Sequence, residues 1–367
     1  MRLLFDWLLL IVALVLPSCS QDINHQKYGH LENVEFLTEE KLPPLQKLNL
    51  EKIELPESCM ASQYVVYHDS VLIVLHVKAP DPYYVTFMKM GTWEVLGEYC
   101  KRGQGPGELI GAGSFSLNSN MLTVVDYPGR TTVVFDVDSL LKDPIGYTPK
   151  YLKDKKVSIV GCLSDSLFVT FNRYFFNDDV RYASSPEAKE LFLFNDACEL
   201  RSETSFENDF FTTNVIGGIF AVNRTRRRII YYRWDVPVYT VYDFDLNPVR
   251  WLVGPEQSDQ QYMVSEDESS NMVYMGDIRN RFAIGSTADG GTAFYGNARA
   301  FHHVGKRELM SKNTAEIFRM DFDGNITARY HCKGNPILTM SFCEASNTLY
   351  ITGHDEVEEN TLYRAKL

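Results

Sequence analysis

The feature that most constrains the fold is a segment that recurs along the chain. Residues 98–106 (EYCKRGQGP) and 328–336 (ARYHCKGNP) have a similar order of residue types, and residues 249–256 (VRWLVGPE) form a looser third copy. Each copy follows a predicted strand and a turn, so we interpret it as one recurring junction in an array of similar units. The chain is therefore predicted to consist of repeated small sheets.

Six segments alternate in polarity and are rich in aromatic and β-branched residues, which is the pattern of half-buried strands. These segments are residues 84–89, 132–137, 190–195, 238–244, 316–322 and 361–367. An apolar strand precedes each of them, at residues 70–75, 121–125, 166–170, 228–232, 291–295 and 347–352. Five of these apolar strands follow a polar turn of the kind found in hairpins. Each pair predicts the middle of one four-stranded blade.

The fold class is therefore all-β, a six-bladed β-propeller of four-stranded antiparallel blades over residues 45–367. The expected blades are residues 56–100, 111–150, 156–205, 214–254, 272–333 and 336–367. Residues 45–55, which alternate in polarity at 48–55, are predicted to be an N-terminal strand that completes the last blade and closes the ring. Closure removes the exposed sheet edges that invite aggregation.

The N-terminus has the character of an export signal. An apolar run at residues 8–16 is too short for a comfortable membrane span, and it ends in Leu16-Pro17-Ser18-Cys19. That ending resembles the lipobox of bacterial lipoproteins, in which the cysteine becomes the lipidated first residue after cleavage. We therefore expect a signal peptide at residues 1–18, a lipid on Cys19 that ties the chain to a membrane, and a tether and lead-in at residues 19–44, polar from about 20 to 30. A plain secretory signal followed by an incidental cysteine is the alternative.

The overall charge argues against polyanionic partners. The chain carries 36 Lys and Arg against 48 Asp and Glu, a formal net charge of −12. An acidic protein is a poor match for nucleic acid, so no nucleic-acid partner is expected. The cysteines after Cys19 lack the close pairs of a metal site, and we favour buried free thiols over disulfides; they are Cys59, Cys100, Cys162, Cys198, Cys332 and Cys343.

The six units, the loop at residues 101–109 (KRGQGPGEL) and the lipobox together resemble the TolB-like six-bladed β-propeller lipoproteins of Gram-negative anaerobes, relatives of the NHL-repeat propellers. This resemblance implies a fold and a location in the cell envelope, on an undetermined side of the outer membrane. It implies no catalytic residue. We interpret the loop as a crossover in which glycines such as Gly105 supply positive φ, and not as a phosphate-binding loop, because no helix start with Lys-Ser or Lys-Thr follows it.

One face of the propeller is the predicted ligand-binding rim. In an up-and-down blade, the loop between the second and third strands lies on the same face as the crossover to the next blade, and two of these loops, residues 172–189 and 297–313, are long. Their aromatic, guanidinium and carboxylate groups suit polar organic ligands such as glycans or peptides. The candidate residues are Tyr127, Arg130, Arg173, Tyr174, Arg181, Arg233, Trp234, Arg299, His302, His354 and Asp355.

The expected function is that of a non-enzymatic, membrane-anchored binding propeller for an extracytoplasmic glycan, peptide or partner protein. No nucleophile elbow, zinc-protease helix or dinucleotide fingerprint occurs in the chain. No cofactor and no metal is expected, since adjacent residues such as His302 and His303 point to opposite sides of a strand. Two alternatives stay open: a hydrolase or lyase acting on glycans or small esters through His302, Asp355 and an arginine, and a structural scaffold in an envelope assembly.

Overall fold

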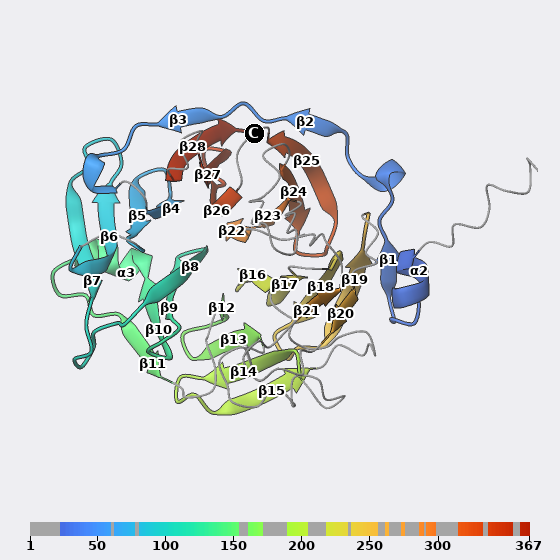
Figure 1. The fold of residues 1–367 in the computed structure, drawn as a ribbon, viewed down its shortest axis with the longest axis horizontal. Helices are drawn as coiled ribbons and strands as arrows, with labels where there is room; N and C mark the ends of the chain where they lie inside the picture. Colours follow the sequence, from blue (N-terminus) through green and yellow to red (C-terminus); the bar gives the residue numbers. More distant parts are fainter. Residues whose placement is uncertain are drawn as a thin grey trace, which may run out of the picture.

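Six small sheets surround a common axis and form a propeller (Figure 1). The computed structural model describes residues 23–59, 62–77, 81–153, 161–171, 189–204, 218–233, 236–255, 261–263, 273–275, 286–289, 291–298, 315–332, 337–354 and 360–367. In each blade four antiparallel strands follow one another from the axis outward. The predicted fold class is confirmed.

The strands have the following bounds. Blade 1 contains β4 (Gln63–Tyr67), β5 (Val71–Leu75), β6 (Tyr83–Lys89) and β7 (Val95–Lys101). Blade 2 contains β8 (Ala112–Asn118), β9 (Met121–Asp126), β10 (Thr131–Asp136), helix α3 (Val137–Lys142) and β11 (Lys150–Lys153). Blade 3 contains β12 (Gly161–Cys162), β13 (Leu167–Phe171), β14 (Leu191–Asn195) and β15 (Leu200–Thr204).

The second half of the ring continues in the same order. Blade 4 contains β16 (Gly218–Asn223), β17 (Arg228–Arg233), β18 (Val238–Asp243) and β19 (Pro248–Val253). Blade 5 contains β22 (Ser286–Asp289), β23 (Thr292–Ala298), β24 (Ala315–Asp321) and β25 (Ile326–Cys332). Blade 6 contains β26 (Ile337–Cys343), β27 (Thr348–His354), β28 (Asn360–Lys366) and β3 (Glu51–Ile53). Between blades 4 and 5, β20 (Gln261–Met263) and β21 (Val273–Met275) pair with each other.

Strand β17 shows why the inner strands are apolar along their whole length. Ile229 and Tyr231 pack into a cluster shared with blade 3, whereas Ile230 and Tyr232 pack into a cluster shared with blade 5. Successive side chains of a strand point to opposite faces of the sheet. The inner strands of a blade that lies between two neighbours therefore need apolar residues at both odd and even positions.

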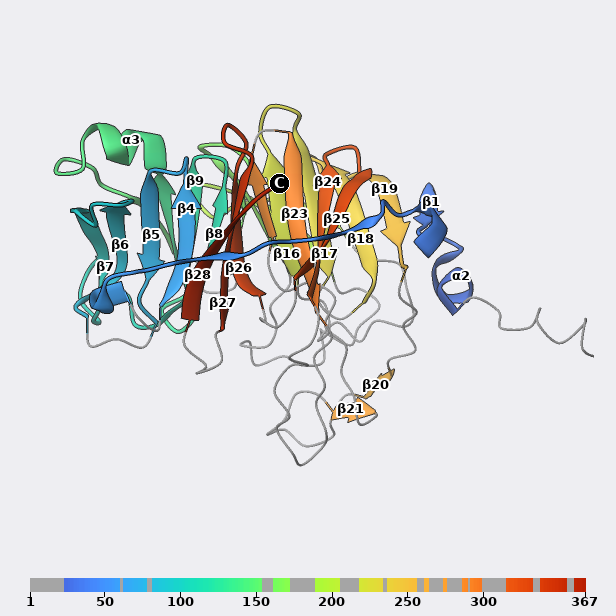
Figure 2. The same cartoon turned by 90° about the horizontal axis from the view of Figure 1, so that it is seen from above.

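We call residues 34–53 the strap, because this segment runs along the outer edges of three consecutive blades (Figures 1 and 2). Strand β1 (Val34–Phe36) pairs in parallel with β19 of blade 4, and β2 (Leu45–Lys47) pairs in parallel with β25 of blade 5. Strand β3 pairs antiparallel with β28, which confirms ring closure by an N-terminal strand. Residues 45–47 were also expected on the last blade, but they lie on blade 5. An extended chain advances about 3.3 Å per residue, so residues 45–55 are too long to fit along the edge of a single blade.

Arginines on the outer strands bind carboxylates of the strap. Arg250 of β19 pairs with Glu35, and Arg364 of β28 pairs with Glu51. Glu39 begins the 3-10 helix η2 (Glu39–Lys41) between β1 and β2, and its carboxylate lies 2.5 Å from Nη1 of Arg329 on β25. Each of the three strap-bearing blades thus adds one arginine–carboxylate pair to its backbone pairing.

Helix α2 (Ile23–Tyr28) is docked on the flank of blade 4 (Figure 1). Its Tyr28 is buried against Trp251 and Val238, and Asn24 is buried as well. We expected the polar stretch from about residue 20 to 30 to serve as the tether. That prediction is wrong from Ile23 onward. The short helix ends at Tyr28, and the ring of this tyrosine covers apolar surface of blade 4.

The crossover from blade 1 to blade 2 contains the glycine-rich loop. The Gly103 N–H donates to the Leu109 carbonyl at 2.9 Å, and the Gly105 N–H donates to Oε2 of Glu108 at 2.9 Å. Positive φ occurs at Gly103 and Gly107 but not at Gly105, which corrects the expectation for that residue. The loop is held by hydrogen bonds within itself.

The inner strands of the opposed blades 2 and 5 touch near the axis. Asn118, the last residue of β8, lies opposite Ala288 of β22 in a parallel bridge. The buried Asn118 side chain also accepts a hydrogen bond from the Val222 N–H of blade 4 at 3.0 Å. Blades 2, 4 and 5 are therefore joined at this end of the axis.

Candidate functional site

The propeller has two faces that differ in their connections (Figure 2). We call the face with the loops between second and third strands the crossover face; the β20–β21 pair projects from it. We call the opposite face the hairpin face. It carries α3 and the turns that join the first strand of each blade to the second and the third strand to the fourth. The predicted rim belongs to the crossover face.

Tyr127 and Arg130 lie on the crossover face, in the turn between β9 and β10. Tyr127 is half-buried and Arg130 is exposed. The buried Asp126 beside them accepts hydrogen bonds from the backbone N–H groups of Gly111 and Gly129, at 3.1 and 2.9 Å. This carboxylate ties the turn to the crossover from blade 1 and so holds Tyr127 and Arg130 in place.

Arg233 does not present its guanidinium on an exposed rim, and its predicted placement is wrong. The residue is 1% exposed and forms a two-point ion pair with Glu190 of blade 3, at 2.6 and 2.7 Å. Nη1 also donates to the Thr240 hydroxyl at 2.8 Å. A buried charge requires such partners, so this arginine joins blades 3 and 4.

The other predicted residues are not brought together by the described part of the chain. His354 is the last residue of β27 and pairs in register with Asn360. The remaining candidates lie outside the described residues: Cys19, Arg173, Tyr174, Arg181, Trp234, Arg299, His302 and Asp355.

A buried histidine network on blade 1 escaped the sequence analysis. His76 Nδ1 lies 3.2 Å from the Ser62 hydroxyl, and Nε2 lies 3.0 Å from the Thr86 hydroxyl and 4.0 Å from Oδ2 of Asp81. Ser62 is only 1% exposed, so no substrate reaches its oxygen. The arrangement therefore ties His76, next to the end of β5, to Ser62 and to Thr86 of β6.

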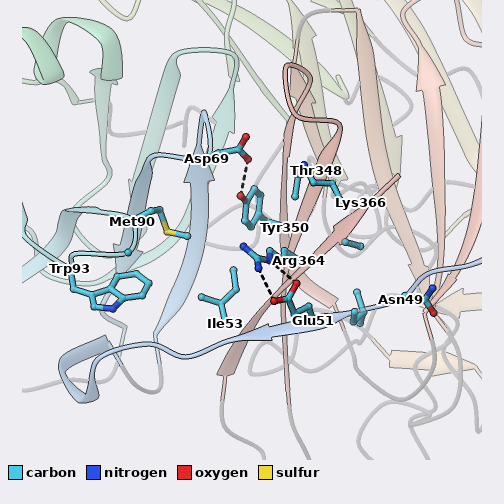
Figure 3. Close-up of a pocket in the computed structure, with 13 residues that line it drawn as sticks. Asn49, Glu51, Ile53, Asp69, Met90, Trp93, Thr348, Tyr350, Arg364 and Lys366 are labelled. Atoms are coloured by element: carbon cyan, nitrogen blue, oxygen red, sulfur yellow. Dashed lines mark hydrogen bonds and ion pairs between the residues drawn. The ribbon is translucent and has the colours of Figure 1, made fainter.

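The described residues form a groove where the ring closes, between blade 6 and blade 1 (Figure 3). Its volume is 860 Å³, which falls within the range of about 300–1,000 Å³ typical of ligand pockets. The strap, β27, β28 and two turns of blade 1 line it, with Asn49, Leu50, Glu51, Ile53, Asp69, Met90, Gly91, Trp93, Thr348, Tyr350, Arg364, Ala365 and Lys366. Asp69 lies in the turn between β4 and β5, and Trp93 lies in the turn between β6 and β7. Because both turns belong to the hairpin face, the groove opens toward that face and not toward the predicted rim.

The apolar part of the groove comes from the turn between β6 and β7. Met90 and Trp93 are half-buried there and pack with Ile53 of the strap against the interface between blades 6 and 1. Trp93 has a φ of 59° two residues before β7, and Leu246 and Gly324 have positive φ two residues before β19 and β25, in the corresponding turns of blades 4 and 5. The conformation of Trp93 is therefore a property of the repeated turn, and the tryptophan side chain is what distinguishes blade 1.

The two carboxylates of the groove already accept hydrogen bonds from groups of the groove itself (Figure 3). Arg364 donates through Nε and Nη2 to the two oxygens of Glu51, at 2.9 and 2.6 Å, and Tyr350 donates its hydroxyl to Asp69 at 2.7 Å. The hydrogen bond from Arg364 lowers the pKa of Glu51. Burial raises the pKa of Asp69, but hydrogen bonds including the one from Tyr350 outweigh it and the pKa is lowered. Both carboxylates are ionised at neutral pH.

No signal in the sequence pointed to this groove. Glu51, Asp69, Trp93 and Arg364 belong to four separate segments, and none of them forms a motif with its sequence neighbours. Within the described residues, no group of three or more His, Cys, Asp or Glu side chains has the arrangement of a metal site. Within the same residues, no helix combines the length and the apolar character needed to cross a membrane.

The six cysteines were expected to be buried free thiols. None of the described cysteines forms a disulfide, and all of them are buried except Cys198, which is half-buried. Burial raises the pKa of the Cys332 thiol to about 11. At neutral pH such a thiol stays protonated and unreactive.

Two solved structures are similar to this chain over most of its length. The crystal structure of a member of the duf4221 family from Bacteroides vulgatus is similar, with a TM-score of 0.53 and 11% identity over 88% of this chain and 100% of that chain. The crystal structure of a putative exported protein from Bacteroides fragilis has a TM-score of 0.49 and 10% identity over 91% of this chain and 98% of that chain. At such identities the likeness of the first structure concerns the fold alone. No curated protein matches the chain.

The sequence itself matches one family model. That model, DUF5128, is described as a 6-bladed beta-propeller, and it matches residues 52–288, which is more than half of the chain. The matched segment begins in β3 and ends in β22, so it includes blades 1 to 4 completely. The chain therefore belongs to the DUF5128 family of six-bladed β-propellers.

Proposed function

We propose that this propeller is a non-enzymatic binding protein of the cell envelope, anchored through a lipid on Cys19, that holds an extracytoplasmic ligand in the groove between blades 6 and 1. The observation that carries the proposal is the groove itself. It combines the size of a ligand pocket with an apolar wall around Trp93 and hydrogen-bonded polar groups around Arg364. Pockets of this composition hold organic ligands.

The ionisation of the groove favours binding over hydrolysis. A glycosidase needs one carboxyl group whose pKa is raised so that it donates a proton at neutral pH. Here the pKa values of both Glu51 and Asp69 are lowered, and both carboxylates already accept hydrogen bonds from Arg364 and Tyr350. Neither group is poised to act as a general acid.

The anchor is supported by the apolar run at residues 8–16 and the sequence Leu16-Pro17-Ser18-Cys19. Cys19→Ala should move the protein from the membrane fraction to the soluble fraction of an exporting host, because the lipid acceptor is lost. Cys198→Ala is the control and should leave the distribution unchanged. A Cys19→Ala protein that stays in the membrane fraction would rule out the lipid anchor.

Ligand binding is tested by a thermal-shift screen of glycans and peptides with the full chain. A ligand of the groove should raise the melting temperature of the wild type and not that of Trp93→Gly. Glycine suits the positive φ of this position, and blade 5 has Gly324 there, so the variant removes the ring without straining the turn. A shift that persists in Trp93→Gly but disappears in a Tyr127→Ala, Arg130→Ala variant would place the site on the crossover face instead.

A further inference from the structure

The charges that line the groove cancel. Glu51 and Asp69 supply two negative charges, and Arg364 and Lys366 supply two positive charges. The two oxygens of Glu51 are bound by Arg364, Oδ1 of Asp69 accepts from Tyr350, and the Lys366 ammonium donates to the Ser346 carbonyl at 2.8 Å. The net charge of these four groups is zero, so they do not favour an ionic ligand of either sign, and such a ligand has to compete with hydrogen bonds that are already formed.

These paired groups still have hydrogen-bonding capacity for a neutral ligand. A carboxylate offers about four acceptor sites, and guanidinium and ammonium groups have five and three donors. Glu51 uses one acceptor site on each oxygen for Arg364, and Asn49 adds an amide that both donates and accepts. Hydroxyl groups donate and accept at the same time, so a polyhydroxylated molecule matches this mixture.

The opposite wall is apolar and partly aromatic. The half-buried Trp93 ring, the Met90 thioether and Ile53 lie on the blade 1 side of the paired charges (Figure 3). An indole buries a large apolar surface at a small cost in side-chain entropy. The flat C–H face of a sugar ring is an apolar surface of suitable shape for this wall, while its hydroxyl groups point outward toward the polar side.

Part of the backbone of the groove is already paired. Strand β28, which supplies Arg364 and Lys366, is paired with β27 on one edge and, over Leu362–Arg364, with β3 on the other. A peptide that binds by adding a strand needs a free sheet edge. Recognition of a ligand by the Leu362–Arg364 part of β28 is therefore limited to side chains.

We infer that the groove binds an uncharged oligosaccharide, with a sugar ring stacked on Trp93 and its hydroxyl groups hydrogen-bonded to the Glu51–Arg364 pair; this inference rests on the binding function proposed above. Acidic glycans and peptides are the competing ligand classes. Each would differ from a neutral oligosaccharide in how its affinity depends on salt or on the structure of the ligand. An acidic glycan requires a net positive site, and its affinity falls as salt rises. A peptide shows sequence preference and no dependence on sugar stereochemistry.

The test is calorimetric titration of the full chain with three probe sets: neutral oligosaccharides that differ in linkage, oligogalacturonides and a library of short peptides. At least one neutral oligosaccharide should bind, and its Kd should stay constant between about 50 and 500 mM NaCl, since neutral ligands are not screened. Trp93→Gly should weaken binding by about tenfold or more, Trp93→Phe should retain most of it, and Leu200→Ala, an exposed residue on blade 3, should change nothing. The tenfold loss corresponds to one lost stacking contact.

The outcomes separate the two proposals. Binding of oligogalacturonides or peptides that depends on Trp93 would overturn the inference and leave the binding function standing. Binding of a neutral oligosaccharide that is unaffected by Trp93→Gly would overturn the inference, because the site would lie elsewhere. Failure of all three probe sets with a folded wild-type chain would overturn the inference and remove the support for binding in this groove.

Discussion

The guanidinium of Arg233 in blade 4 and the carboxylate of Glu190 in blade 3 form a bidentate ion pair, at 2.6 and 2.7 Å, in which neither side chain is more than 1% exposed. Tyr231 and Trp251 place their rings beside the guanidinium, 5.0 and 5.2 Å from its central carbon. Arg233 therefore has ionic, hydrogen-bonding and aromatic partners at the interface of two blades. Removing one partner of such a pair leaves the other charge buried and uncompensated.

Glu190→Ala should destabilise the protein by about 3–5 kcal/mol, because it leaves a buried guanidinium without its counter-charge. Chemical unfolding followed by tryptophan fluorescence measures the change. The control is Arg224→Met, which breaks the exposed pair with Asp165 at 2.7 Å and should cost at most about 1 kcal/mol. Equal effects of the two variants would contradict the structural role of the buried pair.

Tyr28→Ala should cost about 3–5 kcal/mol, the usual range for truncating a buried aromatic residue. The ring is 1% exposed and covers Trp251 on blade 4. Ile145→Ala is the control, since this side chain is fully exposed at 100%, and it should change stability by no more than about 0.5 kcal/mol. If residues 23–30 were a free tether, the melting temperature of Tyr28→Ala would equal that of the wild type.

Gly107→Ala should cost about 1 kcal/mol or somewhat more, because Gly107 has a φ of 79° and a Cβ atom is disfavoured in that region. An added Cβ at Gly107 meets no atom within 4 Å, so the cost is one of backbone conformation alone. Gly105→Ala should cost less. Its φ is not positive, and its Cβ would approach only the flexible end of Glu108 at 3.0 Å. Urea unfolding of both variants tests this order, and a larger loss for Gly105→Ala would contradict it.

The stability of the protein should depend on pH through His76. Burial lowers the pKa of this imidazole from its ordinary value of 6.5; Asp81 opposes the shift and Arg102 adds to it. The unfolded chain then binds the proton more readily than the folded chain. The stability contributed by neutral His76 is therefore complete above pH about 6.5 and is lost as the pH falls toward the folded-state pKa.

His76→Asn should flatten the dependence of the unfolding free energy on pH below about 6.5, because it removes the group that takes up the proton. The control is Ile145→Ala, which changes a fully exposed side chain that does not titrate. The slope of that variant should match the wild type. A slope in His76→Asn equal to that of the wild type would contradict the role of His76.

The blades were predictable because their signal is local. Alternation and apolar runs such as residues 228–232 reflect burial of both faces of a strand, and this requirement applies within a few residues of sequence. Recurrence of the outer-strand junction at residues 98–106 and 328–336 then indicated that the sheets repeat. The candidate site was not predictable in this way. Arg233, a predicted rim residue, is buried and paired with Glu190. The groove lies toward the hairpin face, whereas the predicted rim belongs to the crossover face.

Local patterns in the chain were enough to predict the all-β class, the six repeated units and the need for an N-terminal strand to close the ring, since each depends on periodicity within short segments. They did not predict that the strap covers blades 4 and 5 before it reaches blade 6, or that Glu51 meets Arg364 beside Trp93. Strands of similar polarity fit any outer blade edge in isolation. Their choice among edges, and the groove that results, depends on contacts between residues far apart in the chain, which short-range patterns do not encode.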